Sequence, residues 1–514
     1  MELAAKLTLL VAAAAGYGVQ AVYFTHMFQL NSYRDERYAR WCNENGKKLA
    51  SPLRLLPLLL LVLAFLPLSD TLRYFIGAGI LLLTAGLNLP KKAKKPLVVT
   101  ARVKRLFAAE GLLLLAILGL TFAFAPWRAL FWLGLTSCIV WLWVRIAGWL
   151  MAPIEKAGAK RYIEDARRRI GEMPDLTVIG ITGSYGKTST KVFLQALLSV
   201  KYNVLITPEN YNTTLGVVRT IRENMRPSHQ LFLCEMGAKN VGDIKEICDL
   251  VHPKMGVITS IGEQHLETFG SIENIIKTKF ELADALPADG IAFLNTDNEY
   301  IRAHGAPVEA VGYGFEPTDY TARILSVDEN GCHFTVTAPD GEEATYVTRL
   351  LGAHNIQNLV GCVAVAHRLG IPLSDLAYPI RLLKPVPHRL QLLPNGYIDD
   401  AYNSNPAGFR SALDTLKAFQ NQRVLVTPGM VELGERQEAL NRELGAYAAD
   451  CCDYAVLVGL KQAPPLKEGL LSAGFAPERI YVAATLKEGL AHLAAVPAPA
   501  GRTVLLENDL PDNF

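Results

Sequence analysis

The feature that most constrains the fold is a short glycine turn at residues 183–186, between an apolar run and an amphipathic segment. Upstream, residues 176–182 read L-T-V-I-G-I-T, which is typical of a buried strand rich in β-branched side chains. Downstream, residues 187–200 have the apolar spacing of a helix. A strand, a glycine turn and a helix in this order aim backbone N–H groups and a helix N-terminus at one point, where a polyphosphate is stabilised.

The turn also carries the side chains of a phosphate-binding loop. Lys187 can reach the β- and γ-phosphates of a nucleotide, and the hydroxyl of Thr188 can bind Mg²⁺. Five residues separate Gly180 from Gly186, whereas the common consensus has four. The alternative is a turn that only resembles such a loop. We predict a nucleotide site that includes Gly183, Ser184, Tyr185, Gly186, Lys187, Thr188 and Ser189.

Composition divides the chain near Pro153. The 514 residues are long enough for three domains, at roughly 150 residues per domain. Apolar residues make up 50 % of the chain, and almost all long apolar runs precede Pro153. The net charge of +2 gives no general attraction to nucleic acid, so no nucleic-acid partner is predicted. The eight cysteines form no C-x-x-C pair, which excludes a zinc ribbon and suits a reducing compartment.

Residues 1–153 are predicted to form a membrane α-helical domain with about five spans, embedded in the lipid bilayer. Apolar segments cover about 7–24, 55–68, 74–89, 106–125 and 129–150. The first, fourth and fifth are long enough to cross a bilayer, whereas the second and third are short. A cleaved signal peptide at residues 1–25 is one alternative, although it leaves four later segments unexplained. A buried helical bundle is the other.

Basic residues orient these segments. Lysine and arginine cluster between the first two segments and between the third and fourth, whereas the opposite side offers only Lys6, Arg73 and Arg128. The positive-inside rule then places the N-terminus outside and everything after Pro153 in the cytoplasm. We therefore predict a multi-pass protein of the cell membrane, with a cytoplasmic linker helix at 154–174 and cytoplasmic catalytic domains.

From residue 175 to about 385, strands and helices alternate, which predicts a parallel sheet with helices on both faces. Such sheets bind ligands at the carboxyl ends of their strands. Glu235 ends a buried strand, where a carboxylate is costly unless it holds a cation, so it is a Mg²⁺ ligand candidate. His265 follows the next strand and is a second candidate, although a lone histidine is more often structural. Residues 320–347 predict a small antiparallel insert.

Two weaker signals follow in the same domain. Residues 275–281 predict a helix with Lys277 and Lys279, for which a solvated helical face is the simplest interpretation. Asn295 and Asp297 end a strand and suit adenine or ribose hydroxyls. From residue 386 to 514, five strands alternate with helices in a second, Rossmann-like α/β domain.

Nine motifs occur in one order along the chain and carry a family resemblance: T-G-S-Y-G-K-T-S, N-Y-N-T-T-L-G, E-M-G-A, I-G-E-Q-H-L-E, K-T-K-F-E, L-N-T-D, G-A-H-N-I-Q-N, P-H-R-L-Q and D-D-A-Y-N-S-N-P. They resemble the Mur ligase superfamily, closest to members that add D-alanyl-D-alanine to a muramoyl tripeptide. The likeness covers about residues 175–507. It implies a P-loop central domain, a C-terminal domain that closes over the active site, and ATP-dependent amide formation through an acyl phosphate.

The resemblance also implies roles for single residues. Lys187 and the loop amides hold the phosphates, with Thr188 and Glu235 on a first Mg²⁺. His265 serves a second Mg²⁺, and a carbamylated lysine, matched better by Lys279 than by Lys277, bridges the two ions. Such a set, with arginine and lysine, stabilises the transferring phosphoryl group. The remaining nucleotide contacts implied by the resemblance are Asn295, Asp297, Asn355, Arg389 and Asp400.

Two departures bear on the substrate. The family's uridine-nucleotide-binding domain is absent, and the apolar region occupies its place. The last strand ends in L-E-N-D-L-P-D-N-F, where the muramoyl enzymes have a lysine-glycine-serine turn. We therefore expect a membrane-anchored ligase that joins an amino acid or short peptide to a lipid-linked or polymeric carboxylate of the cell envelope, alongside other envelope-biosynthesis proteins. The alternatives are a polymerase of γ-linked glutamate and a nucleotide-binding subunit that ligates nothing.

Overall fold

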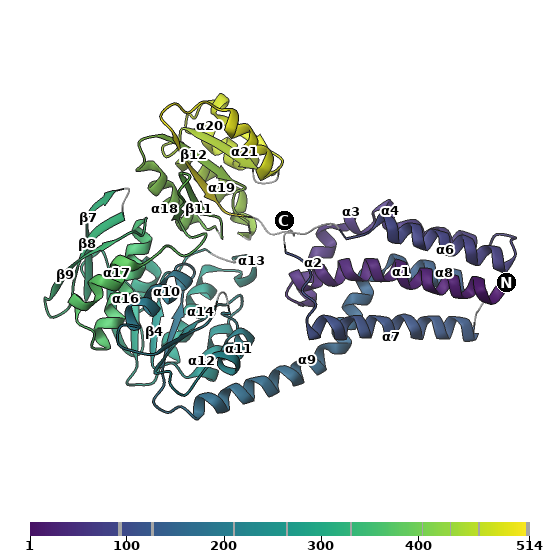
Figure 1. Cartoon of the computed structure of the whole chain (residues 1–514), viewed down its shortest axis with the longest axis horizontal. Helices are drawn as coiled ribbons and strands as arrows, with labels where there is room; N and C mark the ends of the chain where they lie inside the picture. The colour runs from purple at the N-terminus through teal and green to yellow at the C-terminus, as the bar shows by residue number, and fades with distance from the viewer. Residues whose placement is uncertain are drawn as a thin grey trace. The chain divides into compact units, whose positions relative to one another are not determined.

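The computed structural model describes residues 1–90, 95–124, 128–208, 211–263, 266–328, 331–402, 404–431, 433–460 and 463–509. It contains two compact units, Met1–Arg161 and Tyr162–Leu510 (Figure 1). The first unit is helical, and the second holds both sheets.

The helical unit contains ten helical elements in its described residues: α1 (Glu2–Leu30), α2 (Asp35–Glu44), α3 (Gly46–Leu49), α4 (Pro52–Leu55), η1 (Leu56–Leu58), α5 (Leu59–Leu63), α6 (Asp70–Leu87), α7 (Ala101–Phe124), α8 (Ala129–Cys138) and the first part of α9 (Val140–Gly171). Helices α1 and α6 pack side by side, as Figure 1 shows. A Cβ on Gly16 of α1 would lie 3.1 Å from the carbonyl oxygen of Leu81, so glycine permits this close approach.

Apolar side chains cover much of the outside of this unit, and polar ones lie inside it. Leu82, Leu83 and Leu112 are exposed. Inside, the Thr25 hydroxyl donates to buried Glu110 at 3.0 Å, and Gln20 donates to the Ser137 carbonyl at 2.9 Å. Paired polar groups inside and leucines outside are the arrangement that a surrounding bilayer favours.

Two helices in the described part of the chain, α1 and α6, are long and apolar enough to cross a membrane by length and composition. A third candidate arises if α8 and α9, which bend by 79° at Ile139, count as one span. The apolar segment predicted at 129–150 therefore consists of two helices that bend at Ile139. The segment predicted at 55–68 consists of short helical pieces that end at Leu63. About five spans stay a prediction.

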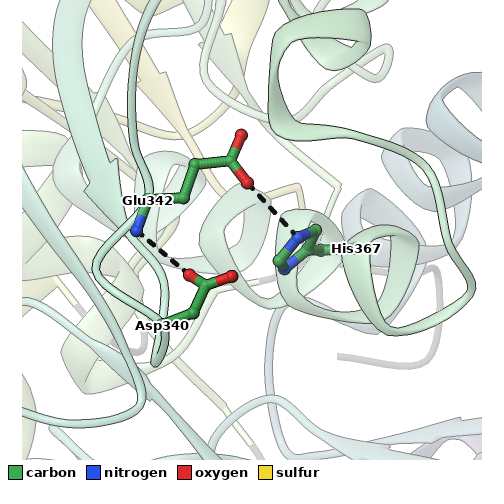
Figure 2. A group of neighbouring side chains, drawn as sticks. All are labelled: Asp340, Glu342 and His367. Carbon is green, nitrogen blue, oxygen red and sulfur yellow. Dashed lines mark hydrogen bonds and ion pairs between the residues drawn. The ribbon is translucent and has the colours of Figure 1, made fainter.

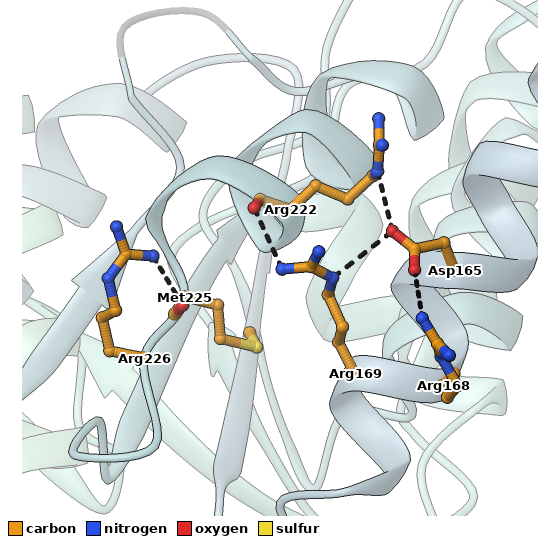
Figure 3. A network of polar contacts seen from close by, with 6 residues as sticks. All are labelled: Asp165, Arg168, Arg169, Arg222, Met225 and Arg226. Carbon is orange, nitrogen blue, oxygen red and sulfur yellow. Dashed lines mark hydrogen bonds and ion pairs between the residues drawn. The ribbon is translucent and has the colours of Figure 1, made fainter.

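Within the second unit, a charged network around Asp165 holds the last turns of α9 (Figure 3). Asp165 accepts hydrogen bonds from Arg168 at 2.6 Å and from Arg222 at 2.8 Å, and it pairs with Arg169 at 3.3 Å. Arg169 also donates to the Arg222 carbonyl at 3.1 Å. Arg222 lies on α11 (Thr214–Asn224), so these contacts join the last turns of α9 to that helix.

The larger sheet has nine strands in the order β2-β3-β1-β4-β5-β6-β7-β8-β9. Its strands are β1 (Thr177–Thr182), β2 (Val204–Ile206), β3 (Leu231–Glu235), β4 (Met255–Ile258), β5 (Ile291–Asn295), β6 (Glu309–Gly314), β7 (Tyr320–Asp328), β8 (Gly331–Thr337) and β9 (Glu343–Thr348). The first six are parallel, which confirms the predicted parallel sheet. The predicted antiparallel insert, β7 to β9, extends this sheet through Tyr313–Tyr320 pairing.

Helices cover both faces of this sheet. Helices α10 (Lys187–Leu198) and α16 (Ala353–Arg368) share a core with β1, β3, β4 and β5, and α11 and α12 (Asp243–Val251) share the core of the opposite face. The other helices here are α13 (Leu266–Phe269), α14 (Ile272–Asp284), α15 (Glu299–His304), η3 (Leu373–Leu376) and α17 (Ala377–Leu382).

The smaller sheet has the order β10-β11-β15-β12-β13-β14. Its strands are β10 (Gln391–Leu392), β11 (Tyr397–Asp400), β12 (Gln422–Thr427), β13 (Tyr454–Val458), β14 (Ile480–Ala483) and β15 (Arg502–Glu507). The helices of this domain are α18 (Pro406–Lys417), η4 (Gly434–Arg436), α19 (Gln437–Ala448), α20 (Ala463–Ser472), η5 (Pro477–Arg479) and α21 (Leu486–Ala495). All strands but β10 run parallel, so the five predicted strands and the Rossmann-like arrangement are confirmed.

Candidate nucleotide and cation site

The loop between β1 and α10 is held in one conformation by the loop that follows β4. The Ser184 N–H donates to the Ser260 carbonyl at 2.7 Å, and the Tyr185 N–H donates to the Ser260 hydroxyl at 3.1 Å. Gly186 has φ 81°, and a Cβ there would lie 2.6 Å from the Asn358 side-chain oxygen. Glycine is therefore required both for the backbone conformation and for the close approach of α16.

Lys187 begins α10 and folds over its own loop. Its Nζ donates to the carbonyls of Gly183 at 2.6 Å and Ser184 at 3.0 Å. Burial, and then the nearby positive charge of Arg389, lower the pKa of Lys187 to about 8. The ammonium group thus lies at the centre of the loop, where it can exchange these carbonyls for phosphate oxygens.

Glu235, at the carboxyl end of β3, is the charged centre of the site and is 1 % exposed. Its Oε1 accepts hydrogen bonds from Thr188 at 3.2 Å and Asn212 at 3.0 Å, and its Oε2 pairs with Lys191 Nζ at 2.9 Å. Burial alone would raise the pKa of Glu235, but the charge of Lys191 outweighs it, so the net shift is downward. The carboxylate is therefore ionised, which a cation ligand requires.

The structure places Thr188 and Glu235 in contact, as the sequence led us to expect. Sequence reasoning missed Lys191 and Asn212. Lys191 lies one helical turn after Lys187, and that spacing was the available signal. Asn212 belongs to the N-Y-N-T-T-L-G motif, to which no chemistry had been assigned.

Lys279 lies on α14 and is 3 % exposed, whereas Lys277 on the same helix is exposed. Burial, and then the positive charge of Lys187, hold the pKa of Lys279 well below its usual range. Its Nζ lies 5.9 Å from the centre of the Phe269 ring. The simplest interpretation of this helix, a solvated face, therefore holds for Lys277 and is wrong for Lys279. His265 lies outside the described residues.

A cavity of about 440 Å³ opens beside the loop. The predicted site residues that line it are Tyr185, Gly186, Ser189, Asn295, Asp297, Arg389 and Asp400. Asn295 donates to the Thr259 carbonyl at 2.7 Å, and Asp297 accepts from Gln357 at 2.5 Å. The Arg389 guanidinium stacks 4.3 Å from the centre of the Tyr402 ring.

Asn355 is not among the described residues that line this cavity. Its amide is buried and donates to the Leu351 carbonyl at 2.8 Å. Residues of α16 that do line the cavity are His354, Gln357 and Asn358, which sequence reasoning missed although they belong to the same motif. Glu507, at the end of β15, also lines the cavity and had been noted only as part of a departure from the resemblance.

Another group of polar side chains, Asp340, Glu342 and His367, lies at the turn between β8 and β9 (Figure 2). Glu342 and His367 approach to 3.7 Å, and the Tyr320 hydroxyl lies 2.9 Å from His367 Nδ1. Asp340 and Glu342 are exposed. These contacts attach the turn to the end of α16, and none of the three residues lines the cavity described above.

Comparison with known proteins gives one consistent result. The profile of the Mur ligase middle domain matches residues 181–366, and the profile of the Mur ligase glutamate ligase domain matches residues 388–507. A UDP-N-acetylmuramoyl-tripeptide–D-alanyl-D-alanine ligase of Bacillus subtilis is 32 % identical over 295 residues, which are 56 % of this chain and 62 % of the relative. The chain thus spans less than two thirds of that relative's length.

Solved structures of two MurF proteins are similar in fold to this chain. MurF from Acinetobacter baumannii has a TM-score of 0.62 and 28 % identity over 68 % of this chain and 77 % of that one. The MurF ligase from Thermotoga maritima, solved in complex with ADP, has a TM-score of 0.61 and 27 % identity over 68 % of this chain and 80 % of that one.

The buried pair of Lys191 and Glu235 yields a stability prediction. Lys191→Met leaves an uncompensated buried carboxylate, and Glu235→Gln leaves an uncompensated lysine, so each costs roughly 3–5 kcal/mol of unfolding free energy. The double variant costs less than the sum of the two, because neither charge then remains alone. Urea unfolding of the full chain in detergent measures this, with exposed Lys467→Met as a control near zero. If the double variant lost as much unfolding free energy as the two single variants together, the ion pair of Lys191 and Glu235 would be contradicted.

Proposed function

Because the chain belongs to the Mur ligase family, we propose that it is a membrane-anchored, ATP-dependent ligase that joins an amino acid or short peptide to a carboxylate of a cell-envelope precursor or polysaccharide. The observation that carries this proposal is the ionised, buried Glu235 hydrogen-bonded to Thr188, directly behind the Lys187 loop. A carboxylate and a hydroxyl at this place suit a magnesium–nucleotide complex.

Mur ligases use ATP and Mg²⁺, and the residues present fit both. Thr188 and Glu235 would hold Mg²⁺, which neutralises charge on a transferring phosphoryl group. Lys187, released from the Gly183 and Ser184 carbonyls, would bind phosphate oxygens, and Arg389 would add a second positive charge from the cavity wall. These groups would stabilise phosphorylation of a substrate carboxylate to an acyl phosphate, which an amine then attacks with loss of phosphate.

Lys279 supports a carbamate in the same site. A lysine whose pKa is held far below its usual range presents a neutral amine, and that amine can attack CO₂. The Nζ–C bond forms, one proton leaves, and the neutral amine becomes an anion. We infer that this carbamate and His265 would serve a second Mg²⁺.

The proposed substrate follows from the kind of region that precedes the matched domains in this chain. The Bacillus subtilis relative is named for a nucleotide-linked muramoyl tripeptide and a dipeptide. In this chain, the region before the matched domains is helical and apolar on its outside. An active site attached to such a region suits a lipid-linked or membrane-emergent acceptor better than a soluble nucleotide-linked one. Cytoplasmic orientation follows from the basic segments.

The first test concerns Lys279. In Lys279→Ala, the proposed carbamate cannot form, so the amino-acid or peptide substituent on cell-envelope material should fall at least about a hundredfold, as for loss of a principal transition-state group. Mass spectrometry of envelope material from cells with wild type, the variant or no protein measures this. Exposed Lys277→Ala, on the same helix, should leave the substituent unchanged.

Full cellular activity of Lys279→Ala would favour the alternative of a nucleotide-binding subunit that ligates nothing. A polymeric product of one repeated amino acid would favour the polymerase alternative.

The second test concerns the membrane. If α1 and α6 cross the bilayer, the full chain should stay in the membrane pellet after extraction with alkaline carbonate, because buried apolar surface does not respond to charge or pH. Release of the full chain into the supernatant by carbonate would instead indicate a peripheral attachment, and the membrane-anchored part of the proposal would be wrong.

A further inference from the structure

An arginine without a counter-ion lies in the helical unit. Arg54 is on α4, directly after the basic segment that contains the exposed Lys47 and Lys48, and it is half-buried. Its guanidinium carbon lies 3.9 Å from the centre of the Tyr23 ring and 4.8 Å from that of the Phe24 ring, both on α1. Among the described residues, no carboxylate pairs with Arg54, and its buried Nη1 has no hydrogen-bond partner.

A second buried donor lies beside the same aromatic ring. Trp41, on α2, is 5 % exposed, and its ring centre lies 6.4 Å from that of Tyr23. Its Nε1–H has no hydrogen-bond partner in the described part of the chain. Arg54, Trp41 and Tyr23 thus form one cluster, in which two N–H donors lack an acceptor.

These unpartnered donors call for an anion with several oxygens. A buried N–H without an acceptor costs free energy, and a buried guanidinium without a counter-ion costs more. Stacking on aromatic faces compensates the positive charge only in part, because a ring face offers no lone pair to the N–H groups. A carboxylate would use both of its oxygens on the guanidinium fork, whereas a phosphate keeps further oxygens for the indole N–H.

Exposed apolar side chains continue from Arg54 along the helical segments that follow it. Leu58 and Val62 come four and eight residues after Arg54, close to the spacing of one helical face, and they are 39 % and 61 % exposed. A soluble phosphate would make no use of this stripe, whereas the hydrocarbon chain of a lipid can lie on it. A basic segment directly before an apolar one is also typical of the depth of lipid head groups.

We propose that Arg54, with the Trp41 indole as a second donor, binds the phosphate group of a lipid whose hydrocarbon chain lies on Leu58 and Val62. The site goes beyond the proposed ligase function, and it rests on the membrane attachment proposed with that function. In this role the helical unit does more than attach the chain to a bilayer, because it selects lipids that carry a phosphate.

Native mass spectrometry of the full chain in detergent, with Mg-ADP present, tests the site. Dioleoylphosphatidic acid is the lipid probe, dioleoylglycerol is the same lipid without its phosphate, and inorganic phosphate is the head group without a lipid. We expect one tightly bound phosphatidic acid per chain and no bound dioleoylglycerol. We also expect that inorganic phosphate, at the same concentration as the lipid, does not displace it.

In Arg54→Gln, the Kd of phosphatidic acid should rise at least about tenfold, because a bidentate charged hydrogen bond is lost. Trp41→Phe keeps an aromatic ring and removes the Nε1–H, so the Kd should rise about fivefold. Exposed Lys47→Gln removes the same charge from the neighbouring α3 and is the matched control, for which the Kd should stay within about twofold. Circular dichroism of each variant that matches wild type shows that the variant is folded.

Equal losses in Lys47→Gln and Arg54→Gln would indicate a general attraction to basic residues and overturn the site. Equal binding of dioleoylglycerol, or displacement of the lipid by inorganic phosphate, would overturn it as well, because the ligand would then be any apolar lipid or a soluble phosphate. A chain that binds Mg-ADP but no phosphatidic acid would overturn this inference and leave the ligase function intact. A chain that binds phosphatidic acid but no Mg-ADP would support the site and contradict the ligase function.

Discussion

The ion pair of Glu235 with Lys191, inside the parallel sheet, is the interaction on which the site depends. A buried carboxylate is tolerated only when it is paired and hydrogen-bonded, and Lys191 and Thr188 of α10 meet that need together with Asn212. The same contacts join β3 to α10 and to the segment before α11. The glycine loop that precedes α10 is thereby held where β1 and β3 end.

Lysine side chains outnumber carboxylates around this pair in the described residues. Three lysines lie near the loop: Lys187, Lys191 and Lys279. Among the described contacts, the carboxylate between them is Glu235. Burial lowers the pKa of both Lys187 and Lys279, and the charge of Arg389 adds to this effect for Lys187, as the charge of Lys187 does for Lys279. A polyphosphate supplies the missing negative charge at Lys187, and a carbamate would supply it at Lys279. In this account the group of buried lysines is suited to an anionic ligand, and burial keeps water from screening the attraction.

Much of this was predictable, because local patterns determine it. The loop at 183–186, the parallel sheet and Glu235 at a strand end follow from β-branched runs and glycine spacing. Residues in contact across the sheet were not predictable. Lys191, Glu507 and His354 matter because of which strands and helices neighbour one another, and a single sequence does not give that register. For α16, the predicted contact Asn355 is buried, and its neighbours in the same motif, His354, Gln357 and Asn358, line the cavity instead. The break at Ile139 carries no glycine or proline signal.

The most direct test of the central claim is calorimetric titration of the full chain with a non-hydrolysable ATP analogue, with and without Mg²⁺. The account predicts one nucleotide per chain, bound at least about tenfold more tightly with Mg²⁺ than without it in wild type, and no such Mg²⁺ effect in Glu235→Ala. Absence of binding, or binding that is indifferent to both Mg²⁺ and Glu235, would contradict it.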